Sequence, residues 1–171
     1  LAATPVPSTV IIVKPFPEPP ASHFTDGITL ALVSVRRNHP SALNPRIKSN
    51  NLLNNALAMQ EALRQGAEEA LMLNQQDEVA ECSQSNFFIV KDGSVWTPPL
   101  TAGLLPGITR EFVFEVGKDA GVAVEEKTLH TGDLWDADEA FITGTTREIT
   151  PVVKVDGRAF GDGTPGPVTL R

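Results

Sequence analysis

The sequence predicts an α+β fold built around an antiparallel or mixed β-sheet. Short runs of β-branched and aromatic residues outnumber the helical segments, and they follow one another as hairpins. Two longer segments instead carry apolar residues at helical spacing. At 171 residues the chain is long enough to bury one hydrophobic core, so we expect a single domain over residues 1–171.

The first part of the chain contains the clearest helix. Residues 1–46 hold much of the proline, which disfavours regular helices and central strands, and leave residues 10–13 and 29–35 as strand candidates. From residue 50 to residue 65 apolar side chains recur at helical spacing, and Gly66 stands where a C-cap is expected. A helix over residues 50–65 is therefore predicted.

Four short runs of strand-forming residues follow this helix and predict two hairpins. The polar turn at residues 74–77 joins the first pair, and Asp92-Gly93, a strong two-residue hairpin signal, joins the second. The four runs are residues 69–73, 78–82, 86–91 and 94–97.

The remainder of the chain alternates between helices and strands. Gly107-Ile108-Thr109 begins a predicted helix that ends near Gly121. The later elements are, in order, a strand over 122–129, a short helix over 131–137 capped by Thr131 or Asp133, a strand over 140–143, the tight turn Gly144-Thr145-Thr146 and a hairpin over 149–160 through Asp156-Gly157.

Charge and composition exclude several classes of function. With a formal net charge of −7 and a pI of about 4.9, the chain has no net positive field for a nucleic-acid backbone. No apolar run is long enough to span a bilayer, and the N-terminal residues lack the pattern of a secretory signal. Cys82 stands alone, so we expect no internal disulfide, no metal site and a reducing cytoplasm.

Five local motifs stand in one order along the chain. They are Ile47-Lys48-Ser49-x-Asn51-Leu52-Leu53, Glu81-x-Ser83-x-x-Asn86-Phe87-Phe88, Leu105-Pro106-Gly107-Ile108-Thr109-Arg110, Ala137-Asp138-Glu139-Ala140-Phe141-Ile142-Thr143-Gly144-Thr145 and Glu148-Ile149-Thr150-Pro151-Val152. Each motif alone is weak, but five in this order and spacing are specific.

The series resembles the signature of class IV (fold-type IV) pyridoxal-phosphate aminotransferases, from about residue 10 to the end of the chain. That family includes branched-chain and D-amino acid aminotransferases, amine transaminases and aminodeoxychorismate lyase. The resemblance implies the family's large C-terminal, cofactor-binding domain, a pseudo-barrel sheet with flanking helices. The family's small N-terminal domain, interdomain loop and closing C-terminal helix have no counterpart in these 171 residues, and an arginine that grips the cofactor phosphate belongs to that N-terminal domain.

Two residues are similar to the family's groups at the reactive end of the cofactor. Lys48 resembles the lysine that forms the imine with pyridoxal phosphate, a role that needs reach and a nucleophilic nitrogen. Glu81 resembles the carboxylate that pairs with the protonated pyridine nitrogen, although Cys82 follows it where the family usually has glycine. By residue type alone, both are more typical of surface residues.

Three further residues resemble the family's phosphate ligands. A helix N-terminus and a tight turn both present N–H groups to an anion. The resemblance places the main-chain nitrogens of Ile108 and Thr109, and Thr145, on the phosphate, and it places the turn at Thr145-Thr146 near the substrate carboxylate. Leu105 resembles the aliphatic residue packed on the cofactor ring, with ordinary core packing as the alternative.

The other candidates do not predict chemistry. Arg36-Arg37 could form a carboxylate clamp, but a solvated strand end is the interpretation we favour, and Arg110 is predicted to support its loop through salt bridges. The histidines have no partner residue at a spacing that indicates a functional site, and they are predicted to be surface residues: His23, His39 and His130.

The resemblance implies transamination between a branched-chain-like amino acid and a 2-oxo acid through Lys48, in a homodimer. The motif beginning at Glu148 favours a transaminase over aminodeoxychorismate lyase, which stays an alternative. The chain has no tyrosine and shows Leu52-Leu53 after the lysine, a form found in D-amino acid aminotransferases, which are a second alternative. A third is a non-catalytic fragment, because part of the family's site lies in the missing domain.

Overall fold

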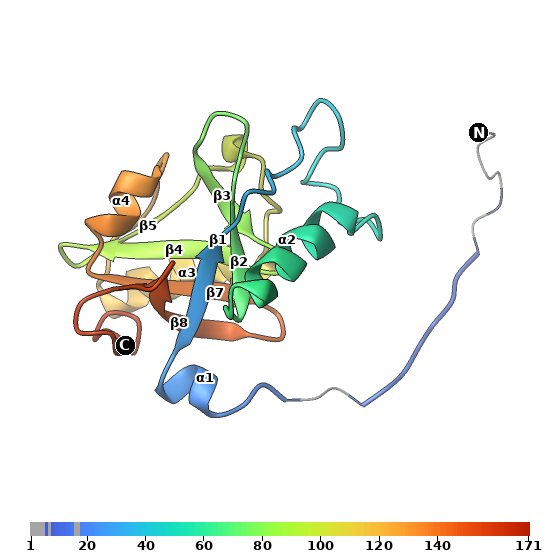
Figure 1. Cartoon of the computed structure of the whole chain (residues 1–171). Helices are drawn as coiled ribbons and strands as arrows, with labels where there is room; N and C mark the ends of the chain where they lie inside the picture. The colour runs from blue at the N-terminus through green and yellow to red at the C-terminus, as the bar shows by residue number, and fades with distance from the viewer. Residues whose placement is uncertain (1–5, 7, 16–17) are drawn as a thin grey trace.

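The computed structural model describes residue 6, residues 8–15 and residues 18–171, and in this part nine strands form one mixed sheet (Figure 1). Part of the proline-rich stretch expected over residues 1–46 lies outside the described residues. The elements are α1 (Ser22–Thr25), β1 (Ile28–Leu32), α2 (Leu53–Arg64), β2 (Glu69–Leu73), β3 (Val79–Cys82), β4 (Asn86–Lys91), β5 (Ser94–Thr97), a 3₁₀ turn (Leu100–Ala102), α3 (Ile108–Ala120), β6 (Val124–Glu126), α4 (Thr131–Trp135), β7 (Glu139–Gly144), β8 (Glu148–Val155) and β9 (Arg158–Ala159).

The strand order is β3-β2-β1-β8-β7-β4-β5-β6, with β9 added to β8. The hairpins are antiparallel, whereas β1 pairs in parallel with both β2 and β8, and β5 pairs in parallel with β6. The sheet curls into a half-barrel with few flanking helices. The predicted α+β fold with a mixed, pseudo-barrel sheet is therefore confirmed.

Alternating side chains divide the core between the two faces of this sheet. On β4, Phe87 and Ile89 pack into the largest apolar cluster, while Phe88 and Val90 pack into a second cluster on the opposite face. Phe88 stacks on Phe141 of β7, with ring centroids 4.7 Å apart. The apolar side chains on both faces explain why these strands read as nearly continuous hydrophobic runs.

The two long helices cover the outer face of the sheet at different places. Helix α2 lies against β2 through Ala58 and Ala62, whose small side chains allow close approach to Ala70 and Met72. Helix α3 packs Val113 onto the cluster that contains Phe88. Neither helix covers the part of the outer face that lies between them.

Several elements differ from the predictions in length. The expected strand over 122–129 is reduced to β6, because its partner β5 is an equally short edge strand. Residues 10–13 are exposed and belong to no strand, whereas α1 and the 3₁₀ turn were not predicted. The N-cap of α4 is His130, so the expected cap at Thr131 or Asp133 is wrong, although the Asp133 carboxylate accepts the N–H of His130 at 2.7 Å. No helix in the described part of the chain has the length and apolar character needed to cross a membrane.

We expect Phe87→Ala to lower the free energy of unfolding by about 3–5 kcal/mol, because Phe87 is fully buried and its removal leaves a cavity. Phe112→Ala is the matched control, since that ring is 56% exposed on α3 and its loss costs less than about 0.5 kcal/mol. Denaturant titration measures both. Equal losses would contradict this assignment of the core.

Candidate active site

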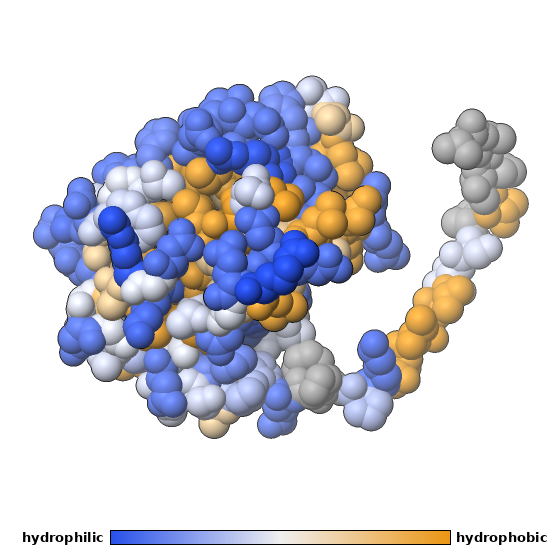
Figure 2. Space-filling view, viewed as in Figure 1, coloured by the Kyte–Doolittle hydropathy of each residue, from blue (hydrophilic) through white to orange (hydrophobic). Residues whose placement is uncertain are grey.

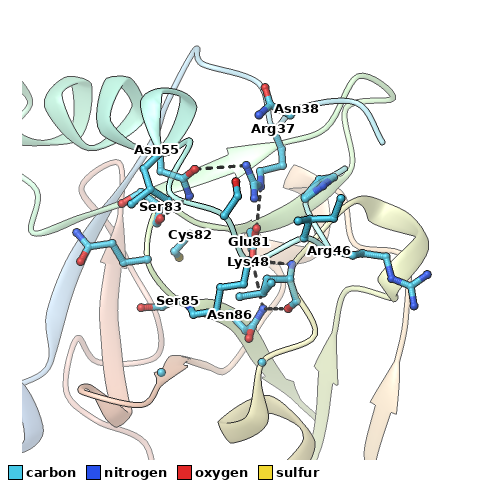
Figure 3. A pocket seen from close by; sticks show the side chains of 18 of the residues that line it. Arg37, Asn38, Arg46, Lys48, Asn55, Glu81, Cys82, Ser83, Ser85 and Asn86 are labelled. Carbon is cyan, nitrogen blue, oxygen red and sulfur yellow. Dashed lines mark hydrogen bonds and ion pairs between the residues drawn. The ribbon is translucent and has the colours of Figure 1, made fainter. Parts of the chain in front are cut away.

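A cavity of about 1070 Å³ opens on the outer face of the sheet between α2 and α3 (Figure 3). The C-terminal ends of β3 and β7 and the N-terminal end of β4 form its floor, and the loop between β1 and α2 forms one wall. The start of α3 forms another wall. Segments far apart in the sequence therefore meet here because the strands that carry them are neighbours in the sheet.

Lys48 lies in the long irregular loop before α2 and lines the cavity. Its side chain is exposed, so the cavity is open to solvent on this side. The loop is shaped by local hydrogen bonds, among them Ile47 N–H to Asn44 O at 3.1 Å and Ser49 N–H to Ile47 O at 2.9 Å. The sequence correctly placed Lys48 before the helix, but the preceding strand β1 ends at Leu32, much further back than expected.

Glu81 is the buried carboxylate of the site, with a side chain only 6% exposed. Its Oε1 accepts the Nε–H of Arg37 at 2.7 Å, and its Oε2 accepts the N–H of Leu105 at 3.1 Å and the amide of Asn86 at 3.3 Å. Burial raises the pKa of Glu81 from 4.5 to about 7, and the charges of Arg37 and Lys48 and the Leu105 N–H oppose that rise. The lysine is therefore close enough to act on this carboxyl electrostatically.

The N-terminus of α3 forms an anion-binding position on the cavity wall. Gly107 is its N-cap and has no capping side-chain hydrogen bond, so the first N–H groups of the helix, including those of Ile108 and Thr109, have no intrahelical partner. Gly107 must remain small, since a Cβ there would collide with the amide oxygen of Asn86. The half-buried Leu105 precedes this turn and also lines the cavity.

The second predicted turn follows β7 at the opposite side of the floor. Thr145 lines the cavity, whereas Thr146 is exposed and is not part of the lining. The turn is closed by Arg147 N–H to Gly144 O at 3.1 Å and by the Thr150 hydroxyl to Arg147 O at 2.7 Å. The cavity thus brings together Lys48 and the other sequence-predicted residues except Thr146: Glu81, Leu105, Ile108, Thr109 and Thr145.

Sequence reasoning missed the residues that hold Glu81. The interpretation of Arg37 as a solvated strand end is wrong: it is 7% exposed and forms a buried ion pair with Glu81, while Arg36 pairs with Asp77 at 2.5 Å. An arginine is buried at low cost only when its charge and hydrogen bonds are satisfied, and Glu81 provides both. The doublet Arg36-Arg37 was the available signal, but its partner lies 44 residues away.

Arg110 lies outside the cavity, whereas Cys82 is part of its lining. Arg110 bonds Pro98 O at 3.0 Å and pairs with Glu126 at 2.6 Å, which confirms its predicted supporting role. Burial raises the pKa of the Cys82 thiol, so this cysteine is a poor nucleophile. In the described ranges, no group of three or more His, Cys, Asp or Glu residues could hold a metal ion.

The arrangement suits a ligand with an electrophilic carbon, a protonated ring nitrogen and an anionic group. Lys48 offers an amine, Glu81 a buried carboxylate, and the start of α3 a set of N–H donors. All three line one cavity, which is where a single ligand could meet them.

Comparison with known proteins gives a consistent result. The model of the family described as amino-transferase class IV matches residues 2–155. The branched-chain-amino-acid aminotransferase of Pseudomonas aeruginosa is 44% identical over 144 residues, covering 84% of this chain and 47% of that protein.

Solved structures show the same relationship. The branched-chain amino acid aminotransferase of Escherichia coli superposes with a TM-score of 0.85 at 39% identity, over 87% of this chain and 49% of that one. The branched-chain amino acid aminotransferase of Thermobaculum terrenum in its PLP form (holo form) gives a TM-score of 0.81 at 38% identity, over 84% and 47%. The chain spans about half the length of these relatives.

The raised pKa of Glu81 predicts a pH-dependent stability. Between pH 4.5 and about 7 the folded protein keeps a proton on Glu81 that the unfolded chain releases, so the free energy of unfolding falls as pH rises through this window. We expect Glu81→Gln to remove this component, which is on the order of 1–3 kcal/mol. Denaturant titrations at several pH values measure it. If the wild-type and variant curves run parallel from pH 4.5 to 7, the assignment is wrong.

Proposed function

The chain belongs to the class IV aminotransferase family, and on that premise we propose that the protein transfers an amino group from a branched-chain-like amino acid to a 2-oxo acid, with pyridoxal phosphate as cofactor. The observation that carries the proposal is the cavity in which Lys48, Glu81 and the open start of α3 meet. The names of the relatives support the reaction and the substrate class.

The residues present fit this cofactor. The buried Glu81 carboxylate is suited to a protonated pyridine nitrogen, and the uncapped start of α3 is suited to a phosphate. Gly107 keeps that helix start free of a side chain, which allows close approach of an anion to the backbone. No competing acidic residue lines the cavity besides Glu81 in the described part of the chain.

Each residue then has a distinct role. Bound pyridoxal phosphate supplies an electron sink that stabilises negative charge on the substrate carbon. Lys48 would hold the cofactor covalently through its Nζ, and as the free amine it would carry the transferred proton, while Glu81 would keep the ring nitrogen protonated. The N–H groups of Ile108 and Thr109, together with Thr145, would bind the phosphate, and Leu105 would pack against the ring.

The substrate carboxylate is assigned to the turn at Thr145-Thr146. Thr145 lines the cavity, and the exposed Thr146 follows it directly in the chain. A tight turn with free N–H groups is a suitable carboxylate site. The amino acid donor and the 2-oxo acid acceptor would bind at this same turn one after the other. Amino transfer would therefore proceed in two half-reactions.

Assembly and location are also proposals. Exposed apolar side chains gather over α2 and the loop before it (Figure 2), among them Ile47, Leu52, Leu53 and Leu57. Such a patch is typical of a protein interface, and we assign it to a homodimer.

A reducing cytoplasm fits Cys82, which is free and buried. We further propose one domain over residues 1–171, because a single sheet connects all three apolar clusters.

We expect Lys48→Ala in the full-length protein to lower amino transfer by roughly 10²–10⁴-fold, because the amine that moves the proton is lost. Borohydride reduction of the wild type with pyridoxal phosphate should attach the cofactor to Lys48. Mass spectrometry of the peptides will identify the modified lysine. Lys154→Ala, which removes an exposed lysine on β8, is the control and should behave as wild type. Attachment to another lysine would refute the assignment.

The substrate class has its own test. We expect leucine, isoleucine and valine to be the preferred amino donors, measured as 2-oxo acid formation against D-alanine, a chiral amine and aminodeoxychorismate. Preference for D-alanine would favour the D-amino acid alternative, and release of 4-aminobenzoate would favour the lyase. Cofactor binding by the full-length protein but not by residues 1–171 alone would identify this chain as a non-catalytic fragment.

A further inference from the structure

The guanidinium of Arg37 joins the two ends of the loop that carries Lys48. Its Nη1 donates to Asn54 Oδ1 at 3.0 Å and to Asn55 Oδ1 at 3.5 Å, both in the first turn of α2 just after the loop. Arg37 itself stands just before the loop, and its main-chain N–H bonds Leu73 O on β2 at 2.8 Å. One side chain therefore fastens the start of the loop to its end.

The asparagines complete this attachment from the helix side. The amide of Asn54 donates to Arg36 O at 2.8 Å and accepts the N–H of Asn38 at 3.3 Å, so the first loop residue is held as well. Asn55 donates to Ser83 O at 2.7 Å, in the segment that follows Glu81. The loop between residues 38 and 52 is thus closed at its base, although Lys48 at its tip is exposed.

The same guanidinium reaches the floor of the cavity through Glu81. Its Nε donates to Oε1 of Glu81, and both side chains are less than a tenth exposed. The other oxygen of Glu81 accepts from Leu105 N–H and from Asn86, whose amide also donates to Leu105 O at 2.9 Å. A continuous hydrogen-bond network therefore runs from the base of the lysine loop to the turn that opens α3 (Figure 3).

We propose that Arg37 is a positioning residue that fixes the Lys48 loop, the Glu81 carboxylate and the start of α3 relative to one another. The proposal rests on the function above, since it gives these three groups one shared ligand. Arg37 touches none of the reacting atoms. It acts by setting where the amine stands and by keeping the carboxylate charged when a protonated ring nitrogen binds to it.

Only arginine can occupy this position fully. Its planar fork directs Nε toward the carboxylate while Nη1 reaches the amide oxygens of α2. A lysine would keep the charge near Glu81 but could not span both partners. The two contributions of Arg37, charge and geometry, are therefore separable by substitution.

Three variants of the full-length protein test the proposal. Arg37→Gln removes the charge, and Arg37→Lys retains the charge and loses the fork. Arg110→Gln breaks the ion pair of another buried arginine with the exposed Glu126, outside the cavity. The first measurement is the titration of the Glu81 carboxyl by carbon-13 NMR in cofactor-free protein, assigned with Glu81→Gln. The second is amide hydrogen exchange over residues 47–52, and the third is the affinity for pyridoxal phosphate.

We expect Arg37→Gln to move the Glu81 titration midpoint up by roughly 1–3 pH units, because the principal opposing charge is gone. Arg37→Lys should keep the midpoint near that of the wild type but speed amide exchange in the loop. Cofactor affinity should fall by roughly tenfold or more in both. Arg110→Gln should leave the Glu81 midpoint and the amide exchange of the Lys48 loop unchanged, even where it lowers thermal stability.

Two results would overturn the proposal. One is an unchanged Glu81 midpoint and unchanged loop exchange in folded Arg37→Gln protein; the other is an equal change in Arg110→Gln, which would make the effect a general loss of stability. The NMR and exchange measurements need no cofactor. If wild type fails to bind pyridoxal phosphate while Arg37→Gln still moves the midpoint, the proposed function fails and the attachment of the loop stands.

Discussion

The ion pair between Arg37 and Glu81 is the constraint on which the cavity depends. Two charges withdrawn from water are tolerated only when they pair closely and their remaining hydrogen-bonding atoms find partners. Here the carboxylate has three donors and the guanidinium has further acceptors on α2. Satisfying these demands draws the lysine loop, the end of β3 and the turn before α3 to one place.

The sheet determines why that place lies on its outer face. Phe87 and its inward-facing neighbours pack together inside the half-barrel. Outside, α2 and α3 each cover part of the sheet with small or branched apolar residues and leave a gap over the ends of β3, β4 and β7. Side chains at strand ends escape the packing demands of the strand centres, so polar groups such as Asn86 and Thr143 can stand there.

The sequence predicted this fold well where the signal is local. Asp92-Gly93 between strand-forming runs and the apolar spacing before Gly66 identified a hairpin and a helix from neighbouring residues alone. The motif series singled out Lys48 and Glu81 without geometry, and both line the cavity. The interpretation of Arg37 was wrong because no residue near it in the chain indicates its partner, Glu81. The two side chains meet only because β1 pairs with β2 and β2 pairs with β3. Burial that depends on long-range pairing has no local pattern.

The charge of the chain and the charge of its cavity have opposite signs, and both follow from the same structure. The net charge of −7 resides largely on the exposed surface, while Arg37, Arg46 and Lys48 line the cavity against the single carboxylate of Glu81. Exposed charges are screened within about 10 Å at ordinary ionic strength, whereas groups around a cavity act on a ligand at contact distance. The start of α3 adds its partial positive charge to theirs. A small anion is therefore attracted locally by a protein whose overall field repels a polyanion, and with Glu81 already held by Arg37, the remaining positive charge is free to act on the ligand.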